Sequence, residues 1–205
     1  MTISLSDAGK RYNREWIFRH FNYQFDAGKT YAITGANGSG KSTLLQVING
    51  SMYANEGKIN YTIDGKQCPA ETVYKAISIC APYLELIEEM TLQEFLLFHQ
   101  KFSPFLPTVD AEKIIALLGL EKATHKQIRY FSSGMKQRVK LAQAIFSDTK
   151  VVLLDEPCTN FDTEGVDLYH QLIQDFCKKR MVIVSSNDHH EYTFCSDILR
   201  MSDWK

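Results

Sequence analysis

The sequence lacks the features of a membrane-spanning or secreted protein. No apolar run approaches the length of about 18–20 residues that a membrane-spanning helix needs. No basic segment followed by an apolar stretch opens the chain, so no secretory signal is predicted. The five cysteines are scattered without a Cys-x-x-Cys pair, which argues against a disulfide framework and a zinc site. We therefore expect a cytoplasmic protein with reduced thiols and no direct membrane insertion.

The sequence also lacks a strong charge of either sign. Its net charge of −1 argues against a nucleic-acid partner held by bulk electrostatics. The one tight basic run, Lys-Lys-Arg at residues 178–180, falls where a helix over 164–179 should end. We interpret it as compensation of that helix's dipole. Length and a 44% hydrophobic content suit one domain with a sizeable core, with or without an inserted subdomain.

What the sequence does contain is a glycine-rich loop between an expected strand and an expected helix. Residues 35–43 fit the spacing Gly-x-x-x-x-Gly-Lys-[Ser/Thr]. Residues 29–34 are rich in β-branched and apolar side chains, and residues 42–50 have a helical pattern. The glycines let several N–H groups converge on one point, next to the positive end of the helix. The candidate nucleotide-binding residues are Gly35, Ala36, Asn37, Gly38, Ser39, Gly40, Lys41, Ser42 and Thr43.

Two acids at the end of a later strand complete a candidate site. Residues 151–154 are apolar, and Asp155 and Glu156 follow them. Such a run is typical of a strand buried on both faces, and ligands bind at its carboxyl end. We expect Lys41 to reach the β- and γ-phosphates of a nucleotide, and Ser42 and Asp155 to ligate Mg²⁺. Glu156 is placed to polarise a water molecule.

Two substructures are expected around this core. Alternating residues at 2–6, 17–25 and 57–64 predict an antiparallel N-terminal sheet. From about residue 91 to 127 the periodicity is helical. Further buried strands are expected at 76–80, 181–186 and 198–201. An exposed aromatic ahead of the loop is a candidate for stacking on adenine; locally, Tyr12 and Trp16 compete with each other and with rings that only pack a turn.

Between the helical stretch and the acidic strand, residues 131–138 read Phe-Ser-Ser-Gly-Met-Lys-Gln-Arg. Here the sequence resembles the nucleotide-binding (ATP-binding) subunit of ABC transporters, over nearly the whole chain. Residues 35–43 match its Walker A loop, 131–138 its signature Leu-Ser-Gly-Gly-Gln-x-Gln-Arg, 151–156 its Walker B strand with the catalytic glutamate, and 159–162 the loop usually written Ser-Ala-Leu-Asp. Tyr12 falls where the family's adenine-stacking aromatic lies, which favours it over Trp16.

The resemblance implies a P-loop NTPase fold of the α/β class. This fold has a RecA-like, mostly parallel sheet, N-terminal antiparallel β strands and an inserted helical subdomain. We expect a single ABC ATPase domain over residues 1–205. Its RecA-like core with the β subdomain would comprise residues 1–80 and 148–205, and the helical subdomain with the signature would span about 81–147.

The resemblance also implies an ATPase with ATP and Mg²⁺ as cofactors. Two subunits, identical or different, would clamp two ATP molecules, each between one Walker A loop and the partner's signature. The signature residues facing the partner's nucleotide would be Ser132, Ser133, Gly134 and Met135. A separate transmembrane permease subunit would hold the chain peripherally at the inner face of the cell membrane. The junction at residues 81–90 would receive a helix of that permease, unless its apolar residues pack inward.

Two positions depart from the family pattern. Pro82 stands where the glutamine loop has its glutamine, and Asn187 stands where the switch histidine is expected. His189 and His190 lie just beyond, so a shifted register is an alternative for the switch. We assign catalysis to Glu156 and Asn187, and we interpret His190-Glu191 as a solvated helix start without a metal. Two functions stay open: an ATPase that powers a transporter, and an ATP switch with weak or no hydrolysis that regulates a membrane-bound complex.

Overall fold

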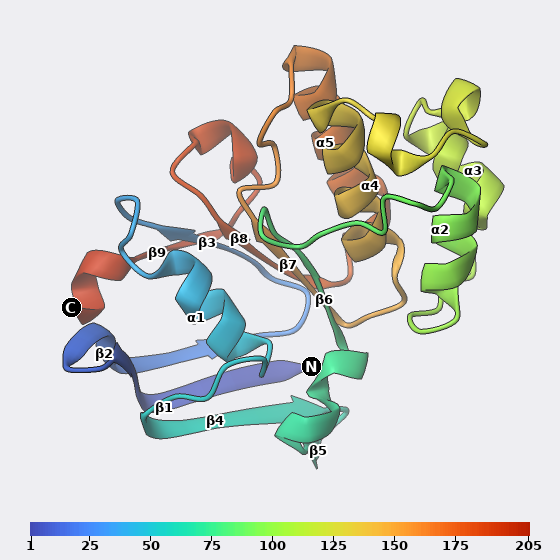
Figure 1. Ribbon diagram of the computed structural model, residues 1–205. Helices are drawn as coiled ribbons and strands as arrows, with labels where there is room; N and C mark the ends of the chain where they lie inside the picture. Colours follow the sequence, from blue (N-terminus) through green and yellow to red (C-terminus); the bar gives the residue numbers. More distant parts are fainter.

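The structure, a computed structural model, describes all 205 residues and contains two sheets (Figure 1). The antiparallel sheet has the order β2-β1-β4-β5, and the parallel sheet has the order β6-β7-β8-β3-β9. Helix α1 (Lys41–Ile48) lies between them. The strands are β1 (Thr2–Tyr12), β2 (Glu15–Phe25), β3 (Thr30–Thr34), β4 (Glu56–Ile63), β5 (Lys66–Cys68), β6 (Ile77–Cys80), β7 (Val151–Asp155), β8 (Met181–Ser185) and β9 (Asp197–Arg200). Expected strands and observed strands agree closely except at β1 and the short β5.

Four further helices share a second hydrophobic core with the opposite face of the parallel sheet. They are α2 (Leu92–Gln100), α3 (Ala111–Leu117), α4 (Ser133–Phe146) and α5 (Thr163–Phe176), with short 3₁₀ turns η1 (Ala70–Lys75), η2 (Glu121–Ala123), η3 (Ile128–Tyr130), η4 (His189–Glu191) and η5 (Met201–Trp204). Local capping starts α2, where Thr91 and Glu94 bond reciprocally in a capping box. No helix combines the length and the hydrophobicity needed to cross a membrane.

Strand β7 confirms the expectation of a strand buried on both faces. Val151 and Leu153 belong to the core that α1 shares with the antiparallel sheet. Val152 and Leu154 belong to the second core, which α4 and α5 complete. Because side chains alternate along a strand, one apolar run serves two cores. This arrangement leaves the carboxyl end of β7 open for polar chemistry.

A bulge in the antiparallel sheet explains why β1 is longer than its pattern predicts. Asp7 has a φ of 50°, and the register with β2 shifts between Leu5 and Ala8. The shift breaks the period-two alternation on which the sequence prediction depends. The strand then continues to Tyr12, and the hairpin that it forms with β2 lies next to the glycine-rich loop.

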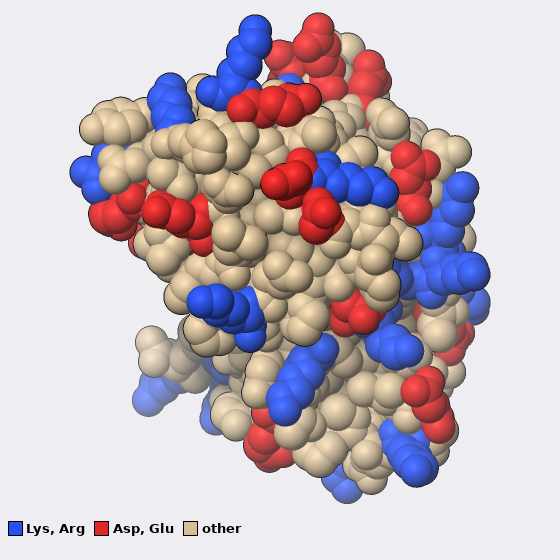
Figure 2. Space-filling model, turned by 90° about the vertical axis from the view of Figure 1, so that its right-hand side faces the viewer, with Lys and Arg blue, Asp and Glu red and all other residues tan.

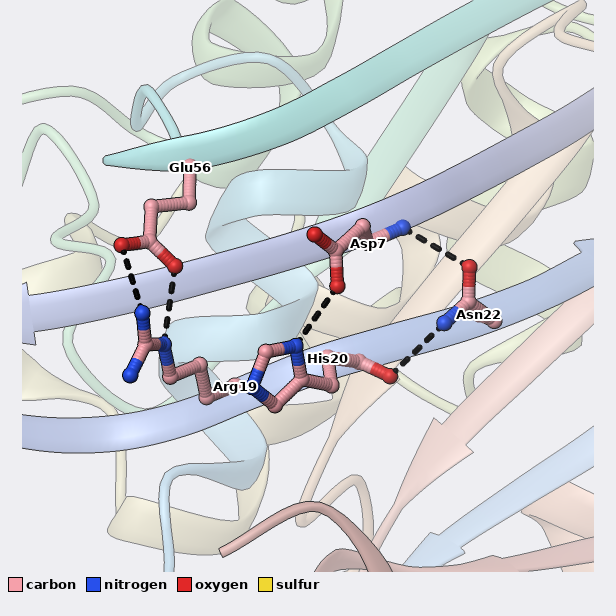
Figure 3. A network of polar contacts seen from close by, with 5 residues as sticks. All are labelled: Asp7, Arg19, His20, Asn22 and Glu56. Carbon is pink, nitrogen blue, oxygen red and sulfur yellow. Dashed lines mark hydrogen bonds and ion pairs between the residues drawn. The ribbon is translucent and has the colours of Figure 1, made fainter.

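Polar contacts fasten the strands around this bulge (Figure 3). Asp7 N–H donates to Asn22 Oδ1 at 2.8 Å, and His20 Nδ1 lies 2.7 Å from Asp7 Oδ1. On β2, Arg19 donates two hydrogen bonds to the Glu56 carboxylate on β4, at 2.8 and 3.0 Å. Exposed pairs of this kind contribute little to stability. They link β1, β2 and β4 beside the irregular register.

The basic run at 178–180 acts differently from our interpretation. Helix α5 ends at Phe176 without a basic residue in its last turn. Arg180 turns inward, is only 8% exposed, and donates to the carbonyl oxygens of Ile145 and Ala144 at the end of α4. We expected the basic run to offset the dipole of α5, and this was wrong. Arg180 instead caps the negative, C-terminal end of α4.

The surface carries charges of both signs. Figure 2 shows the right-hand side of the molecule as seen in Figure 1, where Lys and Arg are interspersed with Asp and Glu and with broad uncharged areas. This distribution agrees with the net charge of −1.

Candidate nucleotide-binding site

The glycine-rich loop leaves β3 inside the parallel sheet and ends at the N-terminus of α1. Gly40 is the N-cap residue, with a φ of 100°. A Cβ at this position would lie 2.3 Å from Ile17 Cγ2 of β2. Both its backbone conformation and this close approach therefore require glycine. Ile17 of strand β2 therefore lies directly against the loop.

Lys41 lies inside this curl. It is 5% exposed, and its Nζ donates to the carbonyl oxygens of Gly35 at 2.7 Å and Ala36 at 3.4 Å. The ammonium is therefore held among the loop's backbone groups, where N–H donors of such loops converge on a phosphate. Contact of Lys41 with the phosphates of a nucleotide stays a prediction.

The two acids lie at the carboxyl end of β7. Asp155 is 2% exposed, and its Oδ1 is buried without a hydrogen-bond partner. An unpaired buried carboxylate oxygen is costly unless a ligand completes it, so Asp155 suits a cation site. Glu156 is half-buried, adopts a φ of 46°, and its N–H donates to Ser185 O at 2.9 Å. Strained backbone of this kind is concentrated at functional sites.

Asn187 comes directly against the loop. Its Oδ1 accepts from Gly35 N–H, and its Nδ2 donates to Asn37 Oδ1, both at 3.1 Å. His189 and His190 turn elsewhere: the His189 ring packs on Tyr192, and His190 Nδ1 lies 3.0 Å from Asp188 Oδ1. The structure therefore brings Asn187, rather than either histidine, to the candidate phosphate site.

Tyr12 and Trp16 differ in how much of each ring is exposed to solvent. Trp16 is half-buried, with the guanidinium groups of Arg19 and Arg11 at 4.5 and 5.5 Å from its ring centroid. Tyr12 is 48% exposed, and its hydroxyl reaches Met52 Sδ at 3.3 Å. Tyr12 therefore offers the more accessible ring to an adenine base.

The signature residues gather around a separate hollow. Ser132 is the N-cap of α4, where its Oγ accepts from Met135 N–H at 3.2 Å. A Cβ on Gly134 would lie 3.2 Å from Asn160 O, so the two segments are in close contact. Ser132, Ser133, Gly134 and Met135 line a hollow of about 470 Å³ together with residues 160–162. No residue of the loop at 35–43 lines this hollow, so the two halves of the expected site lie apart in one chain.

Sequence reasoning missed Glu191. We expected a solvated helix start, but Glu191 is only 4% exposed and its Oε1 accepts from Cys158 N–H at 2.6 Å. Burial raises the pKa of its carboxyl group. Gln137 was noticed only as part of the signature, yet it is also buried and donates to Pro157 O at 2.7 Å. No local sequence pattern predicts either hydrogen bond, because each joins segments that are distant in the sequence.

Comparisons with known proteins agree with this geometry. Residues 18–159 match the family model described as ABC transporter. The uncharacterized ABC transporter ATP-binding protein YybJ of Bacillus subtilis is 29% identical over 98% of this chain and 89% of its own length. The lantibiotic transport ATP-binding protein SrtF of Streptococcus pyogenes is 28% identical over 90% of this chain and 79% of its own length. A putative ABC transporter ATP-binding protein from Pyrococcus furiosus, 20% identical, shares the fold over 100% of both chains with a TM-score of 0.83.

The two sheets, the glycine-rich loop and the acid-ended strand define a P-loop NTPase. The chain belongs to the ABC transporter family, since the match covers more than half of its length. Its activity is the binding and hydrolysis of ATP. The predicted family and fold are thereby confirmed.

Proposed function

We propose that this chain works as one of two paired subunits, and that its ATP hydrolysis powers a separate membrane component. The observation that carries the proposal is the convergence of Lys41, Glu156 and Asn187 at one edge of the parallel sheet, while the signature lies on another face. A second subunit, identical or different, would bring its signature to this edge. The chain would bind to this membrane component and would thereby stay at the membrane surface.

Ser42 and Asp155 would hold the Mg²⁺ ion. Mg²⁺ usually takes one or two protein ligands and completes its shell with substrate phosphates and water. Ser42 lies in the first turn of α1, and Asp155 offers the unpartnered Oδ1. The chain has no cluster of three or more His, Cys, Asp or Glu residues that would suit another metal. When bound there, Mg²⁺ would supply positive charge against the negative charge of the phosphates.

A groove beside β6 supports the proposed membrane partner. It has a volume of about 700 Å³, and its lining includes Tyr74, Leu84, Glu85 and Phe102. Phe102 is 74% exposed and Tyr74 is 65% exposed, so both rings leave apolar surface open to a partner. We propose that a short amphipathic helix of the permease docks in this groove.

The neighbouring residues 82–88 are fastened to α4. Lys140 Nζ donates to Pro82 O at 2.9 Å, and Lys136 Nζ pairs with Glu88. Leu86 packs inward, whereas Tyr83 and Ile87 remain 47% and 38% exposed. The segment therefore keeps apolar contacts for a partner even though part of it packs inward. Charge reversal at Glu88 would also break the ion pair to Lys136, so an apolar position tests docking more cleanly.

Phe102→Asp is expected to lower co-purification of the chain with its permease by about tenfold or more. The substitution would put a charge where the exposed Phe102 ring offers apolar contact to the proposed helix. The measurement is the amount of chain retained per permease after detergent extraction, with thermal unfolding as a folding check. Tyr53→Asp is the control, since Tyr53 is 79% exposed and does not line the groove. Equal retention of both variants would contradict docking in this groove.

Asn187→His is expected to raise kcat by about tenfold with little change in KM for ATP. Loss of one preorganised donor typically costs about a hundredfold or more. Asparagine keeps one N–H donor but is neutral and shorter, so part of that loss applies here. Steady-state kinetics checks the result, because a gain confined to the transition state appears in kcat. His189→Ala and His190→Ala should leave kcat unchanged; if either one abolishes turnover while Asn187→His has no effect, the assignment of Asn187 is wrong.

A further inference from the structure

Glu156, the proposed catalytic base, lies in a strained turn. Glu156 and Asn160 have φ values of 46° and 66°, a left-handed conformation that is uncommon for residues with a Cβ. Inside the turn, the N–H and the hydroxyl of Thr159 both donate to Glu156 O, at 3.2 and 2.9 Å. Such a conformation persists only where surrounding groups fix it. The groups outside the turn therefore decide where the Glu156 carboxylate points.

One of these groups comes from the signature helix. Gln137 lies in α4, is 4% exposed, and donates from Nε2 to Pro157 O at 2.7 Å. Pro157 directly follows Glu156, so this contact fastens the turn to α4. A buried hydrogen bond of this kind restricts the motion of both the Gln137 side chain and the Pro157 backbone.

The second group comes from the segment after Asn187. Glu191 is 4% exposed, and its Oε1 accepts from Cys158 N–H at 2.6 Å. The hydroxyl of Tyr169 in α5 donates to Glu191 O at 2.7 Å, which holds η4 in place. Oε2 of the same carboxylate is buried without a partner. Burying a carboxylate oxygen without a hydrogen-bond partner costs free energy, and apolar packing does not offset this cost.

We propose that Glu191, assisted by Gln137, is a positioning residue that sets the direction of the Glu156 carboxylate. The inference rests on the proposed role of Glu156 as the catalytic base. Glu191 bonds to the backbone two residues beyond Glu156, and Gln137 to the backbone one residue beyond it. The turn is thereby joined to the Asn187 segment and to the signature helix. Movement of either one is transmitted to the acid that polarises the attacking water.

The test compares two substitutions at one position. Glu191→Gln keeps an acceptor oxygen for Cys158 N–H, whereas Glu191→Leu removes it and leaves a buried donor unpaired. We expect Glu191→Leu to lower kcat by about ten- to hundredfold with KM for ATP unchanged, because a small displacement of a catalytic group has an effect of that size. Glu191→Gln should stay within about threefold of the unchanged protein.

Controls separate positioning from general damage. Thermal unfolding and ATP affinity are measured for each variant, and Glu112→Leu replaces an exposed acid in α3 as a matched control. If Glu191→Leu does not fold, Gln137→Leu takes its place and should show the same loss of kcat. A folded Glu191→Leu with the original kcat overturns the proposal, as does a Glu191→Gln that is equally impaired.

Glu156→Gln, assayed in parallel, distinguishes this inference from the proposed function. If Glu156→Gln hydrolyses ATP at the original rate, Glu156 is not the catalytic base, and the proposed mechanism fails with the inference. If Glu156→Gln is inactive while Glu191→Leu is fully active, only the positioning role is overturned. An inactive Glu156→Gln together with a slow Glu191→Leu supports both.

Discussion

Glu156→Gln is expected to lower kcat by at least about a hundredfold while ATP binding is retained. General acid–base catalysis typically contributes a factor of this size or more, and glutamine cannot accept a proton at neutral pH. Glutamine is nearly isosteric with glutamate, so the strained turn and the hydrogen bond from Glu156 N–H to Ser185 O should survive. The substitution therefore removes the base without removing the site.

Two subunits that bind ATP without hydrolysing it should stay paired. Size-exclusion chromatography with ATP and Mg²⁺ is expected to show a dimer for Glu156→Gln, whereas the unchanged protein returns to the nucleotide-free state by turnover. Glu112→Gln is the matched control, because Glu112 is exposed on α3. A variant that remains monomeric and hydrolyses ATP normally would show that another group activates the water.

Much of the fold follows from patterns within short stretches of sequence. The apolar run of β7, the glycines of the loop and the turn at residues 64–65 each specify local geometry with few alternatives. Strand β1 shows the limit of such reasoning. Its bulge at Asp7 depends on partners on β2 and β4, and no period within the strand encodes it. The sequence therefore predicts the elements better than their irregularities.

The candidate site shows the same division. Lys41, Ser42, Asp155 and Glu156 belong to motifs whose spacing alone indicates their chemistry. Glu191 belongs to no motif. Its burial results from the packing of η4 against α5 and against the turn after β7. Arg180 is similar, since only the folded chain brings it to the end of α4. Groups that act through contacts between distant segments become visible only in the structure.

Lys41→Ala is expected to weaken ATP binding by about a hundredfold or more. Lys41 is the cation that the loop geometry holds at the candidate phosphate site, where its Nζ now bonds to the carbonyl oxygens of Gly35 and Ala36. A bound nucleotide would take over these bonds. Two charge-assisted hydrogen bonds at about 1.5–3 kcal/mol each would be lost. A loss of about 3 kcal/mol corresponds to roughly a hundredfold in affinity.

Titration calorimetry with ATP and Mg²⁺ measures this loss directly. Because Lys41 is buried, thermal unfolding of the nucleotide-free protein must first show that Lys41→Ala folds. Lys66→Ala is the control, since Lys66 is exposed in β5 on the antiparallel sheet. The control should bind ATP as the unchanged protein does, because one distant surface charge is screened by salt. An unchanged affinity in folded Lys41→Ala would place the phosphate site outside the loop, and the roles of Ser42 and Asp155 in Mg²⁺ binding would fall with it.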